Sequence, residues 1–237
     1  MSESTRPAPL HVTLAVVLQV RGGSLRALMW ERALEPFAGR WALPGGFLEP
    51  AETLEQSIRR HLAAKVDIRE LAHLEQLETR SDPHRNPEGW ELATAYLGLV
   101  PGDLDPETPD DTAWHRVDVL PPAAFDHGEI VEDGLRRLRA KLSYTNIGFA
   151  LAPRTFTLSE LRAIYVAALG HDVSATNLQR VLLRRGVLEH TGSKREPGKS
   201  GGRPAELFRF RSSRLEVTDP FAVLRPPLRS SRAGNRA

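Results

Sequence analysis

A loop rich in glycine, followed by acidic and basic side chains, is the first segment of this chain suited to chemistry. Residues 39–47 read GRWALPGGF; Glu49, Glu52 and Glu55 follow, and Arg60 comes further on. Glycines permit a tight loop in which a phosphate group can approach the backbone closely. Carboxylates are the ligands that Mg²⁺ prefers. The segment therefore predicts a site for a phosphate-containing molecule.

A second set of side chains is suited to nucleic acid. On the helix predicted over 174–185, four polar residues lie away from the apolar face, and Asn and Arg can read adenine and guanine edges bidentately. The segment that follows combines glycine with basic residues, and its stretch 201–204 (GGRP) resembles a minor-groove hook. Together, these side chains favour contact with DNA over a role of this segment in docking another protein. The set comprises Thr176, Asn177, Arg180 and Arg184 on the helix, then Lys194, Arg195, Lys199 and Arg203.

The charge of the chain divides it into two parts. The 237 residues carry a net charge of +2, yet residues 1–150 hold 16 Lys and Arg against 23 Asp and Glu, a net of −7, which leaves +9 for residues 151–237. A basic part after an acidic part suggests two functions, the second facing a polyanion.

Two absences narrow the class of protein. The chain has no cysteine, which excludes disulfides, thiol nucleophiles and cysteine-based metal sites. No apolar run approaches the length of a membrane span, and the first ten residues lack a signal-peptide pattern. We therefore expect a soluble cytoplasmic protein with no membrane partner.

The elements that position the glycine loop predict an α/β sandwich, a mixed sheet flanked by helices. Apolar, β-branched runs predict strands over 12–19, 25–30, 74–79, 92–100 and 114–117. Helical periodicity is present over 49–64, where Leu54, Ile58 and Leu62 form one stripe, and over 130–142. The first of these helices follows the glycine loop directly.

The basic part has the pattern of an α+β winged helix-turn-helix. Thr157 and Glu160 form a predicted capping box for a helix that ends near Gly170, and the 174–185 helix follows after a short turn. Strands over 187–190 and 205–210 flank the basic segment as a wing. We predict a ligand-binding domain over 1–145, a DNA-binding domain over 150–212, and a basic, disordered tail over 213–237.

The glycine loop and its helix resemble the signature of the Nudix family. That signature has a glycine, a glutamate after five residues and Arg-Glu after seven more; Gly46, Glu52 and Arg60 match it here. Further glutamates of the family hold Mg²⁺ against a pyrophosphate. The signature has three such glutamates, and His61, Ala64 and Lys65 occupy their positions in this sequence. Asp67 occupies the position of the glycine near the end of the signature. The resemblance therefore implies a retained pocket with no metal, no cofactor and no catalytic residues, hence no enzymatic activity.

The chain as a whole resembles the Nudix-related transcriptional regulators (NrtR), from about residue 12 to 210. The resemblance rests on 41–47 (WALPGGF), 156–161 (FTLSEL), Tyr165, 169–170 (LG) and 202–205 (GRPA). It implies a homodimeric repressor of genes for NAD synthesis or salvage, or for pentose use, that ADP-ribose or a related nucleotide releases from double-stranded operator DNA. Carried onto this sequence, the effector site comprises Arg40, Trp41, Gly45, Gly46, Phe47, Glu52, Arg60 and Arg85. Thr191 joins the DNA-contacting residues named above.

Three hypotheses follow for the function. In the first, a ligand closing the pocket shifts the 130–142 helix and thereby the spacing of two winged helices in a dimer. In the second, the chain is a Mg²⁺-dependent Nudix pyrophosphohydrolase of ADP-ribose or a similar compound, using Glu49, Glu52, Glu55 and a further carboxylate. In the third, the winged helix is a scaffold that docks proteins, which steep salt dependence of DNA binding would exclude.

Overall fold

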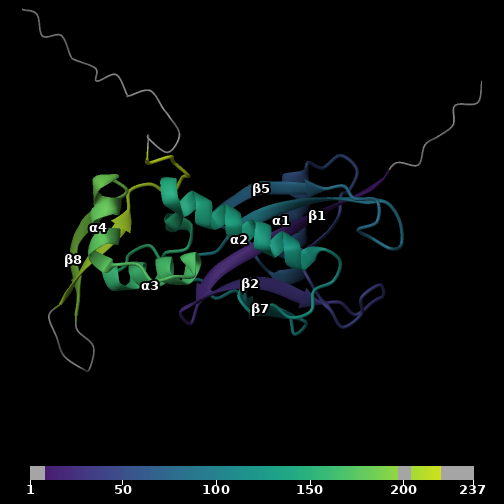
Figure 1. Ribbon diagram of the computed structural model, residues 1–237, viewed down its shortest axis with the longest axis horizontal. Coiled ribbons are helices and arrows are strands. Elements are labelled where there is room, and N and C mark those ends of the chain that lie inside the picture. Colours follow the sequence, from purple (N-terminus) through teal and green to yellow (C-terminus); the bar gives the residue numbers. More distant parts are fainter. Residues whose placement is uncertain (1–8, 197–203, 220–237) are drawn as a thin grey trace, which may run out of the picture.

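Two domains follow one another along the long axis of the molecule (Figure 1). The computed structural model describes residues 9–196 and 204–219. The elements of the N-terminal domain are β1 (Leu10–Arg21), β2 (Ser24–Glu31), β3 (Trp41–Ala42), β4 (Gly45–Phe47), α1 (Leu54–Val66), β5 (His73–Arg80), β6 (Glu91–Leu99), β7 (Thr112–Arg116) and α2 (His127–Tyr144). The strands and helices predicted from apolar periodicity are all present, with boundaries shifted by a few residues. Among the described residues, no helix has both the length and the apolar character that a membrane crossing requires.

The N-terminal domain is built on a mixed sheet, as predicted. Strands β1 and β6 pair in parallel at its centre, within the order β3-β2-β1-β6-β5, and β4 and β7 add to β1 and β2. Ala15 and Val17 pack with α1, whereas Val16 and Leu18 pack in the core on the side of α2. Because successive side chains of a strand point to opposite faces, a strand covered on both faces reads as one apolar run.

Helix α1 begins later than its predicted start at residue 49. Thr53 accepts a hydrogen bond from the Gln56 backbone while the Gln56 side chain accepts one from Thr53, which forms a capping box. Asp67 ends the helix with φ 49°, in the left-handed region that Asp tolerates better than most residues other than glycine. The position of the signature glycine therefore keeps its backbone conformation in this chain.

The C-terminal domain is a winged helix, as predicted. Its elements are the 3₁₀ helix η1 (Ile147–Ala150), α3 (Leu158–Leu169), α4 (Ala175–Arg184), β8 (Leu188–Arg195) and β9 (Ala205–Phe210). The capping box of Thr157 and Glu160 is present, and Gly170 ends α3 with φ 78°. Strand β8 runs to Arg195 rather than ending at His190, so the wing contains more strand than the sequence predicts.

The prediction of a disordered tail from residue 213 is wrong for the residues up to Asp219. The Asn146 side chain donates to the Arg214 carbonyl at 2.8 Å and accepts from the Glu216 backbone at 2.7 Å. Arg185 pairs with Asp219 at 3.2 Å. Thr145 and Val217 also form an isolated β-bridge, so backbone pairing holds this segment together with the Asn146 side chain. Residues 220–237 lie outside the described part of the chain.

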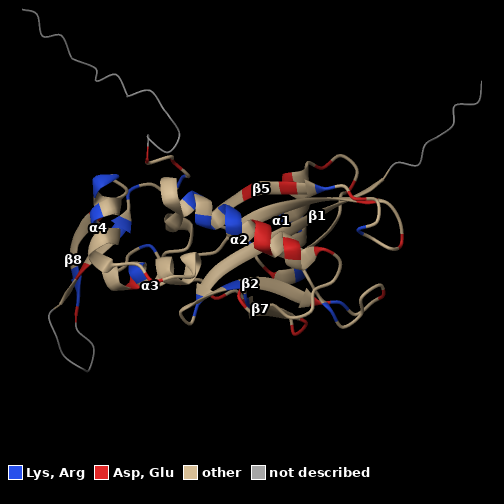
Figure 2. Cartoon of the chain, in the orientation of Figure 1, with Lys and Arg blue, Asp and Glu red and all other residues tan. Residues whose placement is uncertain are grey.

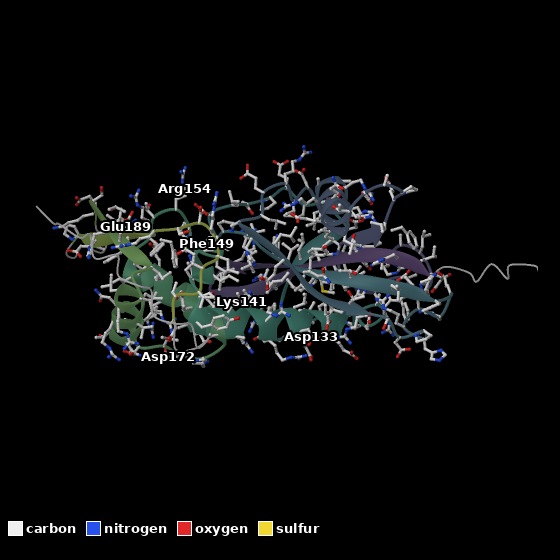
Figure 3. All side chains as sticks on the ribbon, turned by 90° about the horizontal axis from the view of Figure 1, so that it is seen from above. Asp133, Lys141, Phe149, Arg154, Asp172 and Glu189 are labelled. Atoms are coloured by element: carbon white, nitrogen blue, oxygen red, sulfur yellow. The ribbon has the colours of Figure 1, made fainter. Side chains whose placement is uncertain are left out.

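One hydrophobic core joins the two domains. Val16 and Leu18 of the sheet belong to the same buried cluster as Leu138 of α2 and Phe156 and Leu161 of the winged helix. Phe149 lies at the junction, beyond the α2 residues Asp133 and Lys141 (Figure 3). Arg139 also donates to the Ala168 carbonyl of α3 at 3.2 Å. A displacement of α2 therefore reaches the winged helix through packed side chains.

Candidate functional site

The glycine loop packs too closely against its neighbours to admit side chains. A Cβ on Gly45 would lie 2.0 Å from the Thr13 carbonyl oxygen of β1, and one on Gly46 would lie 2.5 Å from Cε1 of His61. Strand β4 pairs with β1 through Leu14 opposite Gly45. The two glycines therefore let the loop join the sheet on one side and contact α1 on the other.

Arg60 holds the acidic side chains of the loop. It donates to both carboxylate oxygens of Glu52, at 2.6 and 3.1 Å, and pairs with Glu49 at 3.2 Å. The Glu49 backbone also donates to Glu52 at 2.7 Å. The hydrogen bond from Arg60 is the main cause that lowers the pKa of Glu52 to about 2. Both carboxylates are thus neutralised from within the site.

His61 and Lys65 hold the carbonyl groups of the same loop. His61 Nε2 lies 3.0 Å from the Phe47 oxygen, and Lys65 Nζ donates to the Gly45 oxygen at 2.7 Å. The two residues are four apart on α1 and therefore share one face of the helix. Desolvation lowers the pKa of both side chains, and nearby cations, Arg32 among them for Lys65, act in the same direction.

A cavity of about 480 Å³ opens in front of the loop. Four of the predicted effector residues line it, namely Gly45, Gly46, Phe47 and Arg60. Sequence reasoning missed the other side chains suited to a ligand, because they come from the end of β2 and the residue after it, from α1, and from the residues around the start of α2. These are Trp30, Arg32, His61, Lys65, Phe125 and His127. His61 and Lys65 could have been found, since they stand at signature positions.

The remaining predicted effector residues lie outside the cavity lining. Arg40 is exposed, with its guanidinium 5.8 Å from the Phe37 ring. Trp41 contacts the His115 ring edge to face, with the ring centroids 4.1 Å apart. Glu52 lies behind Arg60, and the Arg85 side chain is only 2% exposed. These four residues can support the cavity wall but do not face a ligand in it.

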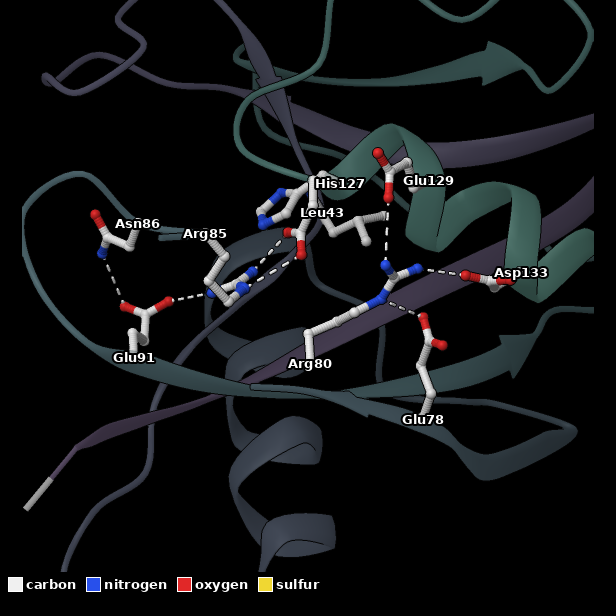
Figure 4. A network of polar contacts seen from close by, with 10 residues as sticks. Leu43, Glu78, Arg80, Arg85, Asn86, Glu91, His127, Glu129 and Asp133 are labelled. Atoms are coloured by element: carbon white, nitrogen blue, oxygen red, sulfur yellow. Dashed lines mark hydrogen bonds and ion pairs between the residues drawn. The ribbon is translucent and has the colours of Figure 1, made fainter. Parts of the chain in front are cut away.

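Arg85 organises a buried polar network beside the cavity (Figure 4). Its guanidinium bonds both Asp126 oxygens, at 2.7 and 3.2 Å, and Glu91 at 2.6 Å. Asn86 donates to the other Glu91 oxygen at 3.3 Å. Burial opposes ionisation of Asp126, but Arg85 outweighs it and lowers the pKa of that carboxyl. Since Asp126 precedes α2, the network connects the loop of Arg85 with the start of that helix.

His127, the first residue of α2, is buried and neutral. Its Nδ1 accepts a hydrogen bond from the Leu43 backbone at 3.0 Å, so the proton of the ring is on Nε2. Burial lowers the pKa of His127 to about 3, and the cations Arg85 and Arg32 add to this against the opposing effect of Asp126. The glycine-loop segment is thereby tied directly to α2.

Acid should destabilise the protein through His127. The folded state does not protonate this ring until about pH 3, whereas the unfolded chain protonates it near 6.5. The contribution of the neutral ring to the free energy of unfolding is therefore complete above pH 6.5. Below that pH it falls by up to about 1.4 kcal/mol per pH unit. Urea unfolding from pH 7 to pH 5 measures the slope. His127→Asn keeps an acceptor at the place of Nδ1 and should flatten it; an unchanged slope would refute this role.

The site does not fit the Mg²⁺ that the signature glutamates of the Nudix family hold. Glu49 and Glu52 are bound to Arg60, and Glu55 pairs with Arg59 at 2.9 Å. Lys65 brings a positive charge to the loop carbonyl of Gly45. Within residues 9–196 and 204–219, no group of three His, Asp or Glu side chains converges on a point that could hold a metal ion.

Helix α4 presents the predicted DNA-binding residues. Leu178 and Leu182 are buried, and the opposite face exposes Thr176, Asn177, Arg180 and Arg184. Ser174 caps the helix, and Arg180 donates to Asn177 at 2.8 Å. Figure 2 shows positions of basic residues, coloured blue, along this helix at the winged-helix end of the molecule. An exposed helix face with Asn and two Arg is suited to the major groove.

The wing residues differ in how free they are to contact DNA. Lys194 is exposed, and Arg195 is exposed but paired with Glu160 of α3. Thr191 is half-buried, and its hydroxyl donates to the Leu207 carbonyl at 3.0 Å, so it holds the hairpin together. Lys199 and Arg203 lie outside the described residues.

Ion pairs connect strand β5 to α2 near both ends of the helix. Arg80 pairs with Glu129 at 3.2 Å and with Asp133 (Figure 4). Glu75 pairs with Lys141 at 3.0 Å near the other end. The acidic residues of α2 lie in its first half and the basic residues in its second half, as the red and blue segments of the ribbon show (Figure 2), and this distribution suits the helix dipole. The helix is thus held as a rigid connection between the cavity and the winged helix.

Comparison with known proteins finds matches for both domains. Residues 9–134 match the NUDIX domain, and residues 148–210 match the NrtR DNA-binding winged helix domain. The chain is 32% identical over 215 residues to the ADPR responsive transcriptional repressor NtrR of Acinetobacter baylyi, across 88% of this chain and 84% of that protein. It is also 32% identical over 114 residues to an ADP-ribose pyrophosphatase of Methanocaldococcus jannaschii, across 47% of this chain and 66% of that enzyme.

Two crystal structures of NrtR from Shewanella oneidensis resemble this chain. The structure of that protein with a 27mer DNA has a TM-score of 0.74 and 31% identity, and the match covers 84% of this chain and 93% of the other. The structure of its NUDIX domain with ADP ribose has a TM-score of 0.52 and 32% identity, and the match covers 58% of this chain and 94% of the other.

Proposed function

The chain belongs to the NrtR family of Nudix-related transcriptional regulators, and from that premise we propose that it is a DNA-binding repressor released from its operator by ADP-ribose. The observation that carries the proposal is the joining of two sites by one helix. A cavity with basic and aromatic lining lies at the start of α2, and a winged helix with an exposed basic helix packs at its end.

The chemistry of the cavity suits ADP-ribose or a closely related nucleotide. Arg32 and Lys65 offer positive charge to a pyrophosphate, and Trp30 and Phe125 offer aromatic surface to a base or a ribose. Of the predicted effector residues, those that would contact the ligand are Gly45, Gly46, Phe47 and Arg60. The others, Arg40, Trp41, Glu52 and Arg85, would support the cavity wall without contacting the ligand. Relatives described as ADPR responsive or solved with ADP ribose support this ligand.

Double-stranded DNA is the proposed partner of the winged helix. Asn177, Arg180 and Arg184 would enter the major groove, and Lys194 and Arg195 would follow the backbone. A homodimer would place two such helices about one DNA turn apart. ADP-ribose is what remains of NAD when nicotinamide is removed, so genes of NAD synthesis or salvage are the proposed targets. A protein of this function works in the cytoplasm.

The proposal includes the absence of hydrolysis. The carboxylates that the alternative pyrophosphohydrolase would need are engaged by Arg59 and Arg60, and Lys65 disfavours a divalent cation beside the loop. The relationship to an ADP-ribose pyrophosphatase extends over 47% of this chain. We propose that the chain keeps the ligand of such enzymes and has lost their reaction.

Helix α2 is the proposed connection between ligand and DNA. Its 18 residues span about 27 Å at 1.5 Å each. At its start, His127 lines the cavity and accepts from Leu43. A ligand pushing on this end would move the winged helices of a dimer out of register with DNA, provided that it binds the two arrangements unequally.

An electrophoretic shift tests the function. DNA from upstream of the protein's own gene and of neighbouring NAD genes is incubated with the protein, with and without ADP-ribose, first without metal and then with Mg²⁺. We expect a shift that ADP-ribose abolishes while remaining uncleaved. No shift on any fragment, together with release of AMP from ADP-ribose, would overturn the proposal in favour of the enzyme.

A further inference from the structure

The cations of the cavity fall into two groups by their partners. Arg60 is occupied by Glu49 and Glu52. In contrast, Arg32 and Lys65, which also line the cavity, have no carboxylate partner among the described residues. Arg32 donates to the Pro36 carbonyl at 2.9 Å and lies over the Phe125 ring at 4.9 Å. Two positive charges are therefore available to an anion in the cavity.

Lys65 is fixed in place from two sides. Its ammonium donates to the Gly45 carbonyl at 2.7 Å and lies 5.5 Å from the centre of the Trp30 ring. An ammonium has three donors, so this bond leaves two for oxygens of a ligand. Arg32 lies 5.9 Å from the same Trp30 ring. Both of these cations therefore lie beside the same indole, and the charge of Arg32 acts on Lys65.

From this arrangement we propose that the Lys65 ammonium, with Arg32, supplies the positive charge that a divalent cation supplies in metal-dependent Nudix enzymes, so that the effector's pyrophosphate is bound without metal. The inference rests on the proposed function for the identity of the effector, but not for the chemistry of the anion. Lysine binds phosphate as a point charge, whereas Mg²⁺ coordinates carboxylates and substrate phosphates directly. Both bring positive charge to the phosphate oxygens, but only the metal needs carboxylate ligands from the protein.

The electrostatics of the unliganded site agree with this assignment. Desolvation and the charges of Arg32 and Arg60 lower the pKa of Lys65. Binding of a further cation in the cavity is therefore electrostatically unfavourable. A bound pyrophosphate would relieve the repulsion among these side chains. A divalent cation placed beside Lys65 would increase it. The same residues therefore favour the anion and oppose the metal.

Calorimetric titration of the full chain with ADP-ribose, in EDTA and in excess MgCl₂, tests the inference. We expect equal affinity in the two buffers, within about twofold. Lys65→Met should weaken binding at least tenfold, whereas Arg59→Met, which removes an exposed cation six residues earlier on α1, should leave it unchanged. Binding that needs Mg²⁺, or a Lys65→Met variant that binds as tightly as the wild type, would overturn the inference.

A second probe and the wild-type titrations keep the outcomes distinct. The wild-type comparison of EDTA with MgCl₂ requires no variant, so binding that needs Mg²⁺ would overturn the inference even if Lys65→Met does not fold. If ADP-ribose fails to bind in either buffer, inorganic pyrophosphate is the second probe. Pyrophosphate binding in EDTA that Lys65→Met abolishes would uphold the cation assignment while the proposed effector fails. No binding of either compound would overturn both.

Discussion

Replacing Arg85 with methionine should destabilise the protein more than any other single change considered for the N-terminal domain. The substitution would leave Asp126 and Glu91 without the cation that bonds them at 2.6 to 3.2 Å. Removing one partner of a buried ion pair costs about 3–5 kcal/mol. In a chain of this length, that corresponds to a melting temperature lower by roughly 6–20 °C. Thermal and urea unfolding measure the effect.

Arg116→Met is the matched control for this prediction. Arg116 pairs with Asp118 at 2.6 Å, but its side chain is 53% exposed. Exposed pairs contribute at most about 1 kcal/mol, so the control should melt close to the wild type. Because Asp126 precedes α2, we also expect Arg85→Met to respond less to ADP-ribose at temperatures where it remains folded. A loss of stability no larger than that of Arg116→Met would contradict the structural role of Arg85.

Replacing Arg180 with alanine should weaken operator binding without changing the affinity for ADP-ribose. Arg180 is exposed on α4 and is held by Asn177 at 2.8 Å, which orients the guanidinium. Loss of an arginine that contacts a base costs about 1–3 kcal/mol, or roughly 5- to 150-fold in affinity. Fluorescence anisotropy with labelled operator measures the change, and calorimetry with ADP-ribose measures the other site.

The salt dependence of the same variant separates base contact from phosphate contact. A base-reading arginine relaxes specificity at one position, whereas a phosphate-contacting cation lowers the slope of log affinity against log salt by about one. Arg69→Ala is the control, because Arg69 is 75% exposed in the other domain. Operator affinity unchanged by Arg180→Ala, or lowered equally by Arg69→Ala, would show that α4 is not the recognition helix.

Local sequence patterns predicted the elements whose conformation depends on residues close by in the sequence. The capping box of Thr157 and Glu160 and the left-handed Gly170 depend on neighbours a few residues away, and both are present. The apolar run over residues 12–19 predicted a strand, and β1 contains it. The short strands β3 and β4 escaped prediction, because two or three residues carry no periodicity.

The site was harder to predict, because its side chains come from distant segments. Arg32 directly follows β2 and Lys65 lies on α1, and what they share is the Trp30 ring, whose centre is 5.9 Å from Arg32 and 5.5 Å from Lys65. Arg85 has the sequence context of a ligand-binding loop residue, yet its partner Asp126 lies 41 residues further along the chain. The polar segment after residue 213 looks disordered because the sequence does not indicate that Asn146 binds it. In each case the missing information was a tertiary partner.

The measurement that tests the central claim most directly is the affinity for ADP-ribose with and without saturating operator DNA. If ligand and DNA compete for arrangements of the same dimer, each must weaken the other by the same factor, typically about 5- to 150-fold. Calorimetric titration of the full chain, free and on its operator, gives that factor. We predict weaker ADP-ribose binding on DNA. Equal affinity in the two titrations would contradict the account, because a ligand that does not distinguish the two states cannot release the DNA.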